Sequence, residues 1–145
     1  MNQKDLLLIE DNPDDVFLMR RALQKTGFEF PLHVVSDGQQ ALNYLAGEDE
    51  FADRDTYPIP SLILLDLKLP YLSGFEVLEW IRDNPALQQV EVVILTSSAE
   101  DRDQRRAREL SVATYLVKPP RPETLKPILQ RLIHIGPAPR ELLES

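Results

Sequence analysis

The chain has 145 residues, enough for one ordinary domain, and 43% of them are hydrophobic, which indicates a folded core rather than a disordered or fibrous chain. Sixteen Lys and Arg against 24 Asp and Glu give a formal net charge of −8, which argues against nucleic acid and anionic membranes as partners. The sequence has no cysteine, so disulfides, thiolate zinc sites and thiol nucleophiles are excluded. No apolar run is long enough for a membrane helix, and the N-terminus lacks the features of a signal peptide. The predicted location is the cytoplasm.

Short apolar runs predict the strands. Four of them are continuous rather than alternating: 6–9, 62–65, 92–95 and 114–117. Continuous hydrophobicity is typical of strands that are covered on both faces, as in a parallel sheet. A shorter run over 32–36 follows Pro31 and is predicted to be an edge strand.

Apolar residues at helical spacing fill the stretches between these runs. They predict five helices: 14–26, 38–45, 74–83, 99–110 and 122–135. Strand and helix therefore alternate, which predicts one α/β domain over 1–135 with a parallel sheet and helices on both faces. Segment 47–60 is polar with two prolines and is predicted to be a long surface loop, while 136–145 is predicted to be a short tail.

Polar side chains follow the predicted strands at their carboxyl ends. Glu10 and Asp11 follow the first run, Asp66 follows the run 62–65, Thr96 ends the next run, and Lys118 follows the last. In an open parallel α/β sheet these ends lie along one edge, where ligands bind. We therefore expect three carboxylates, a hydroxyl and an ammonium group along one rim.

Carboxylates gathered this closely repel one another, by about 4 kcal/mol for a pair ~4 Å apart at an effective dielectric of ~20. A hard divalent cation removes the repulsion, and oxygen ligands without His or Cys favour Mg²⁺ over zinc. A carboxylate beside Mg²⁺ and a lysine is equipped to attack phosphorus and form an aspartyl phosphate. The Thr96 hydroxyl would then donate to the new phosphoryl group.

Each of these residues also has a plainer interpretation when taken alone. Residues 10–13 can simply end a strand and cap a helix, because acidic residues favour a helix N-terminus. Thr96 is equally a strand residue, and Lys118 a solvated strand end. His33 and His134 have no acidic or second histidine partner at ligand spacing, so both are predicted to be structural or surface residues.

Taken together, these residues resemble the receiver domains of two-component response regulators, from Leu6 to about Ile135. The matching motifs are Glu10-Asp11, Asp66-Leu67-Lys68-Leu69-Pro70 with Gly74, Thr96-Ser97 and Lys118-Pro119. The resemblance implies a flavodoxin-like (βα)5 doubly wound parallel sheet with strand order 2-1-3-4-5. It also implies that 1–135 is a receiver domain.

The resemblance implies a phosphoacceptor and a metal site. Asp66 would be the phosphoacceptor. Mg²⁺ would be bound by Asp11, by Asp66 and by the backbone carbonyl of Lys68, while Glu10 would act through a water molecule. Glu10 stands where the family more often has Asp, and its longer side chain is expected to keep this role.

The resemblance also implies the residues that respond to phosphorylation. Lys118 would contact the phosphoryl group, and the Lys118-Pro119 peptide bond would be cis. Thr96 and Tyr115 would be the switch pair, the ring filling the space that the hydroxyl leaves. Pro127 interrupts the last helix pattern and is expected to distort its first turn.

The predicted function is that of a single-domain response regulator rather than an enzyme. It would take a phosphoryl group from a sensor histidine kinase and signal through a changed protein-interaction or dimer surface. The narrower resemblance is to the small regulators paired with bacterial, especially cyanobacterial, phytochrome histidine kinases, which are often homodimers. The implied partners are such a kinase, an unidentified downstream protein and a second copy of the chain. The apolar residues Ile133, Ile135, Leu142 and Leu143 suit a dimer contact or a docked C-terminal helix equally well.

Two other functions stay open. One is a receiver-like interaction module without phosphotransfer, although such chains usually lose the acid pair, the acceptor or the lysine. The other is a phosphohydrolase of the haloacid dehalogenase type, which also uses an Asp after a parallel strand. That chemistry normally requires a second acid two residues later, where this chain has Lys68.

Overall fold

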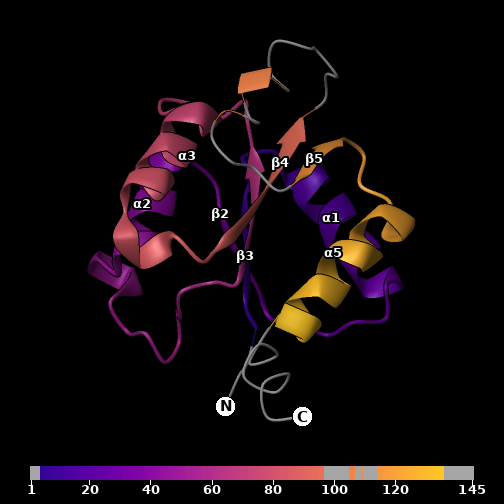
Figure 1. The fold of residues 1–145 in the computed structure, drawn as a ribbon. Helices are drawn as coiled ribbons and strands as arrows, with labels where there is room; N and C mark the ends of the chain where they lie inside the picture. The colour runs from indigo at the N-terminus through magenta and orange to yellow at the C-terminus, as the bar shows by residue number, and fades with distance from the viewer. Residues whose placement is uncertain (1–3, 97–104, 107–108, 110–113, 136–145) are drawn as a thin grey trace.

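The computed structural model describes residues 4–96, 105, 106, 109 and 114–135, and its centre is a five-stranded parallel sheet (Figure 1). The strands are β1 (Leu6–Ile9), β2 (Leu32–Val35), β3 (Leu62–Asp66), β4 (Glu91–Thr96) and β5 (Thr114–Val117). Their order is β2-β1-β3-β4-β5. The predicted flavodoxin-like sheet is confirmed, including the edge position of the strand after Pro31.

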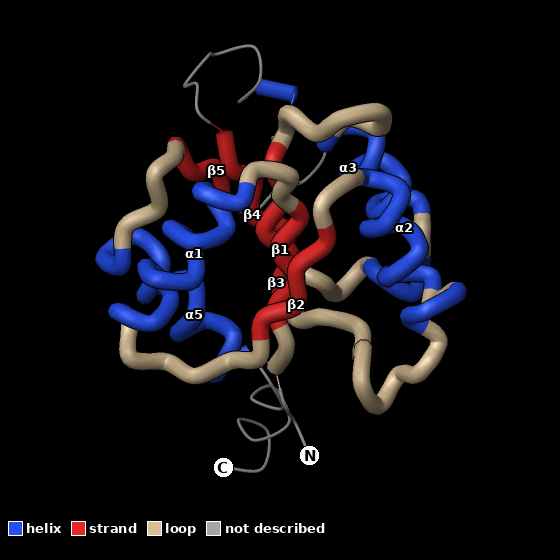
Figure 2. The backbone as a smooth tube through the Cα atoms, turned by 180° about the vertical axis from the view of Figure 1, so that it is seen from behind, coloured by secondary structure: helices blue, strands red, loops and turns tan. Residues whose placement is uncertain are grey.

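Helices cover both faces of the sheet, as Figure 2 shows. α1 (Pro13–Lys25) and α5 (Pro122–Ile135) lie on one face, and α2 (Gly38–Ala46) and α3 (Gly74–Asp83) lie on the other. A short 3-10 helix, η2 (Pro85–Leu87), leads into β4. The helix predicted over 99–110 lies largely outside the described residues, as does the tail over 136–145.

The interior strand β1 shows why the apolar runs are continuous. Side chains of a strand alternate between the two faces of its sheet. Leu6 and Leu8 therefore pack in the cluster with α1 and α5, whereas Leu7 and Ile9 pack in the cluster with α2 and α3. All four are at most 1% exposed. Each contributes about 1.5–3 kcal/mol relative to an exposed position, so both faces of β1 hold the fold together.

The segment 47–60 differs from its prediction as a surface loop. It contains a 3-10 helix, η1 (Asp49–Phe51), and Phe51 is buried with its ring centroid 5.1 Å from those of Tyr44 and Tyr57. The Arg54 guanidinium donates to three backbone carbonyls: those of Tyr44, Leu45 and Tyr57. The prediction was wrong in this respect, because the segment, although polar in composition, contains one buried aromatic side chain and one partly buried arginine that binds several carbonyls.

His33 is a structural residue, as predicted. Its Nε2 lies 2.7 Å from an Oδ of Asp5, so it does have an acidic partner, one brought close by the pairing of β1 with β2. The side chain of His134 lies outside the described residues.

α5 continues through Pro127 to Ile135. Within the described part of the chain, no helix has the length and apolar character to cross a bilayer.

Candidate functional site

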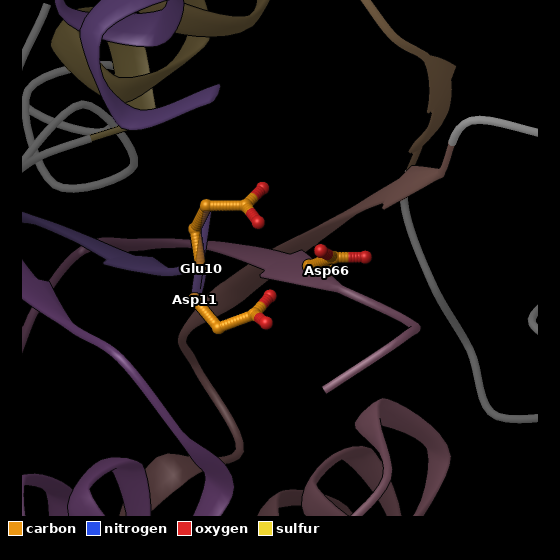
Figure 3. Close-up of side chains that lie close together, drawn as sticks. All are labelled: Glu10, Asp11 and Asp66. Carbon is orange, nitrogen blue, oxygen red and sulfur yellow. The ribbon is translucent and has the colours of Figure 1, made fainter. Parts of the chain in front are cut away.

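Five polar residues predicted from the sequence lie at the carboxyl edge of the sheet. Glu10 and Asp11 follow β1, Asp66 is the last residue of β3, Thr96 ends β4, and Lys118 follows β5. One carboxylate oxygen from each of Glu10, Asp11 and Asp66 lies within 4.8 Å of the other two, and Figure 3 shows these three side chains at the ends of the two neighbouring strands. The sheet order accounts for this, because β1 and β3 pair directly.

The turn after β1 fixes the first two acids. Asn12 is the N-cap of α1, its side-chain oxygen accepting from the backbone N–H of Asp14 and of Asp15, and Pro13 starts the helix. The Asn12 N–H in turn donates to a Glu10 carboxylate oxygen at 3.2 Å. Glu10 is 2% exposed, whereas Asp11 faces solvent. One acid of the pair is thus held inside, and the other is open to an incoming ion.

The turn after β3 shapes the surroundings of Asp66. The Lys68 N–H donates to a carboxylate oxygen of Asp66 at 2.9 Å, and the Gly74 N–H donates to the carbonyl of Leu67 at 3.0 Å. A Cβ on Gly74 would overlap the carbonyl oxygen of Asp66 and would lie 2.6 Å from Cα of Leu67. Only glycine permits α3 to begin this close to the end of β3.

Lys118 closes the site from β5. Its Nζ lies 2.6 Å from Glu10, 2.9 Å from Asp15 and 3.0 Å from Asp66, measured to one carboxylate oxygen of each. Asp15 was not among the predicted site residues. Its signal in the sequence is only an acid in the first turn of a helix, which Asp14 shares, so nothing there distinguishes the two.

These contacts and the burial of the site shift the pKa values of Glu10 and Lys118. Burial raises the pKa of Glu10 to about 7; the nearby Asp66 adds to the rise, while Lys118 opposes it. Burial alone would lower the pKa of Lys118, but its hydrogen bonds to Glu10, Asp15 and Asp66 outweigh burial and raise it. The ammonium therefore stays charged, and the acids share its charge.

The predicted switch residues, Thr96 and Tyr115, lie on the paired strands β4 and β5. Thr96 is fully buried, and its carbonyl accepts from the backbone N–H of Lys118 at 2.6 Å. Tyr115 is partly buried and packs against the cluster of α2 and α3. The predicted cis peptide bond between Lys118 and Pro119 is confirmed.

The donor set fits a hard divalent cation. Glu10, Asp11 and Asp66 offer oxygen ligands alone, without imidazole or thiolate, and three converging carboxylates carry more negative charge than one ammonium neutralises. A divalent cation would remove the remaining repulsion. The chemistry of the donors thus agrees with the cofactor predicted from the sequence.

Doubly wound sheets bind their ligands at the carboxyl edge, and in this chain that edge carries the acidic cluster and Lys118. The family model described as "Response regulator receiver domain" matches residues 6–130. The chain belongs to this family.

Curated relatives agree with this assignment. The chain is 37% identical over 127 residues to the probable methanogenesis regulatory protein FilR2 of Methanothrix harundinacea, which covers 88% of this chain and 79% of that protein. It is 38% identical over 115 residues to the response regulator Rcp1 of Synechocystis sp., with 79% and 76% covered.

Solved structures share the fold over most of the chain. The bacteriophytochrome response regulator RtBRR is 40% identical with a TM-score of 0.80, covering 90% of this chain and 78% of its own. The Mn(2+)-bound form of Rcp1 is 35% identical with a TM-score of 0.73, covering 90% and 92%. The phosphorylated cyanobacterial phytochrome response regulator RcpA is 34% identical with a TM-score of 0.75, covering 91% and 92%. The receiver fold and the likeness to phytochrome-associated regulators are therefore both observed.

Proposed function

We propose that this chain acts as a response regulator receiver in which Asp66 accepts a phosphoryl group from a histidine kinase, in a reaction that depends on Mg²⁺. One observation carries the proposal: the Asp66 carboxylate lies within 4.8 Å of two further acids and 3.0 Å from the Lys118 ammonium. A nucleophile, charge neutralisation and an opening to solvent at Asp11 thus occur together. The phosphorylated RcpA structure is a relative on which phosphorylation is recorded.

The transfer is a displacement at phosphorus. One carboxylate oxygen of Asp66 attacks the phosphorus of a phosphohistidine; the new P–O bond forms as the P–N bond breaks, and the electron pair returns to the imidazole nitrogen. The Lys68 N–H holds the other carboxylate oxygen, which orients the attacking one. Lys118 then pairs with a phosphoryl oxygen, and Thr96 donates its hydroxyl to another.

The metal would be held by Asp11 and Asp66 directly, by the backbone carbonyl of Lys68 and, through water, by Glu10. When bound, Mg²⁺ supplies positive charge that offsets the carboxylates and the incoming phosphoryl oxygens. The Mn(2+)-bound form of Rcp1 is a relative that binds a divalent cation, which supports the proposal. Exposure of Asp11 leaves the cluster open to an ion from solvent.

The signal would leave the site through Thr96 and Tyr115. As the Thr96 hydroxyl moves to the phosphoryl group, the Tyr115 ring fills the vacated space, and the surface near β5 and α5 changes shape. That surface would bind a downstream protein or a second copy of the chain. The names of RtBRR and RcpA favour a phytochrome as the histidine kinase.

The alternative functions have less support. An interaction module without phosphotransfer would not require the ion pairs of Lys118 with Glu10 and Asp66 for its function. A phosphohydrolase would require an acid at position 68, where this chain has a lysine. The chemistry proposed is limited to the chain's own phosphorylation and dephosphorylation.

Intact mass after incubation with acetyl phosphate tests the proposal. One phosphoryl adduct is expected with Mg²⁺, and none in EDTA or in Asp66→Asn. Asp55→Asn, an exposed acid outside the site, is the matched control and should be phosphorylated like the wild type. If wild type forms no adduct and also fails to bind beryllium fluoride with Mg²⁺, the proposed function is wrong.

A further inference from the structure

We propose that Asp15 is a positioning residue: it keeps the Lys118 ammonium beside Asp66 after the other carboxylate partners of that ammonium have been engaged by metal and phosphoryl group. The inference rests on the proposed function, and it assigns a task to an acid that the phosphoacceptor chemistry alone does not require. Three observations carry it: the pairing of Lys118, the separate tasks of its partners, and the capping of α1.

The first observation is that Lys118 is fully paired. An ammonium group has three N–H donors, and Nζ has three carboxylate partners: Glu10, Asp15 and Asp66, at 2.6, 2.9 and 3.0 Å. The Lys118 side chain is 13% exposed, so water supplies little in place of a lost partner. Each carboxylate therefore contributes to where the ammonium lies.

The second observation is that two of the three carboxylate partners of Lys118 have other roles in the proposed reaction. Glu10 and Asp66 belong to the carboxylate cluster that fits a divalent cation, and Asp66 is also the attacking group. Asp15 is not part of that cluster among the described residues. Once cation and phosphoryl group engage Glu10 and Asp66, Asp15 is the carboxylate of the three that remains for the ammonium.

The third observation is that the fold aims Asp15 at the site. Asn12 caps α1 by accepting from the N–H groups of Asp14 and Asp15, at 2.8 and 3.4 Å, so the first helical turn is fixed. Asp15 from this turn reaches Lys118, whereas no ion pair among the described residues joins Lys118 to Asp14. Both acids favour the helix N-terminus equally by charge, which makes Asp14 a matched control for Asp15.

The test compares Asp15→Asn with Asp14→Asn, two variants with the same change in charge in the same turn. Of the two variants, only Asp15→Asn removes a charge-assisted hydrogen bond to Lys118. Asp15→Asn is therefore expected to slow phosphorylation by acetyl phosphate by about tenfold relative to Asp14→Asn. Asp15→Glu, which keeps the carboxylate, should recover most of the rate. Equal rates for the two Asn variants, or a faster Asp15→Asn, would overturn the proposal.

A double-mutant cycle shows whether Asp15 acts through Lys118. In a Lys118→Gln background, Asp15→Asn should have no effect beyond that of Asp14→Asn. If the tenfold loss persists without the ammonium, Asp15 acts in some other way and the positioning role is refuted.

A readout without metal or phosphoryl donor completes the test. In EDTA, acylation of Lys118 by an amine-reactive ester, followed by peptide mass spectrometry, should be severalfold faster in Asp15→Asn than in Asp14→Asn, because a side chain that is 13% exposed and has lost one of its three carboxylate partners is held less firmly inside the site and meets the reagent more often. Equal labelling would count against the proposal. Failure of the proposed function looks different: wild type, Asp14→Asn and Asp15→Asn would then all remain unphosphorylated, while the labelling difference would still report on the pairing of Lys118.

Discussion

At the scale of single residues, the site depends on where charge is buried. Glu10 is 2% exposed, yet its carboxylate belongs to the same cluster as the exposed Asp11. Lys118 neutralises part of this charge and keeps Glu10 from being an isolated buried acid. The sequence predicted these residues because they follow apolar runs. It did not reveal Asp15, whose contact depends on the rotation of α1 about its axis.

Glu10 gives a prediction about pH. Burial raises its pKa to about 7 in the folded protein, against an ordinary value of 4.5, so between these values the folded protein holds a proton that the unfolded chain releases. The stability associated with this proton is fully present below the unfolded pKa and is lost as the pH rises through about 7. In EDTA, wild type should therefore lose about 2 kcal/mol more than Glu10→Gln between about pH 5 and about pH 7, measured by urea unfolding. The same loss in both proteins would show that Glu10 is not the group responsible.

At the scale of elements, the agreement between sequence and structure follows from burial on both faces of the sheet. The apolar run 6–9 is β1, and 62–65 is β3 without its final Asp66. Among the described residues, α2, α3 and α5 begin at the predicted residues, whereas α1 begins at Pro13 rather than at residue 14, because the cap is Asn12. The 47–60 segment was missed as a packed unit, since no periodic pattern marks a single buried ring among polar residues.

The junction of β3 and α3 gives a second prediction. Because a Cβ on Gly74 would overlap the Asp66 carbonyl oxygen, Gly74→Ala must displace the backbone of Asp66, the proposed phosphoacceptor. We expect the unfolding free energy to fall by about 1–3 kcal/mol and phosphorylation by acetyl phosphate to slow severalfold. Ser73→Ala, which removes only the N-cap bond to Glu76, is the control and should cost about 1 kcal/mol without a comparable loss of rate. Wild-type stability and rate in Gly74→Ala would contradict this account.

The 47–60 segment gives a third prediction. Arg54 donates to carbonyls at the end of α2 and within the segment, so Arg54→Ala should lower the unfolding free energy by about 1.5–3 kcal/mol. Arg54→Lys should recover little of it, because an ammonium lacks the planar fork that reaches several carbonyls at once. Chemical denaturation measures both, with the exposed Arg21→Ala as the control. If Arg54→Ala unfolds like Arg21→Ala, the Arg54 hydrogen bonds do not stabilise the segment.

At the scale of the whole molecule, the proposed output is a change in association. Val117 on β5 is 45% exposed, and Ile133 on α5 is 50% exposed. Both lie on elements whose surface is proposed to change when Thr96 and Tyr115 move. Sedimentation velocity should show more dimer when beryllium fluoride and Mg²⁺ mimic the phosphoryl group, and no such change in Asp66→Asn. If wild type keeps one unchanged association state, dimerisation is refuted as the response to phosphorylation. The changed surface would then bind a downstream protein instead.

The most direct measurement is chemical identification of the phosphorylated residue. After incubation with acetyl phosphate and Mg²⁺, borohydride reduces an acyl phosphate to an alcohol, so an aspartyl phosphate is converted to homoserine and can be located by peptide mass spectrometry. We predict homoserine at position 66 alone, absent when acetyl phosphate or Mg²⁺ is left out. Reduction at Glu10 or Asp11 instead, or phosphorylated protein with an unmodified Asp66, would contradict the assignment of Asp66 as the phosphoacceptor.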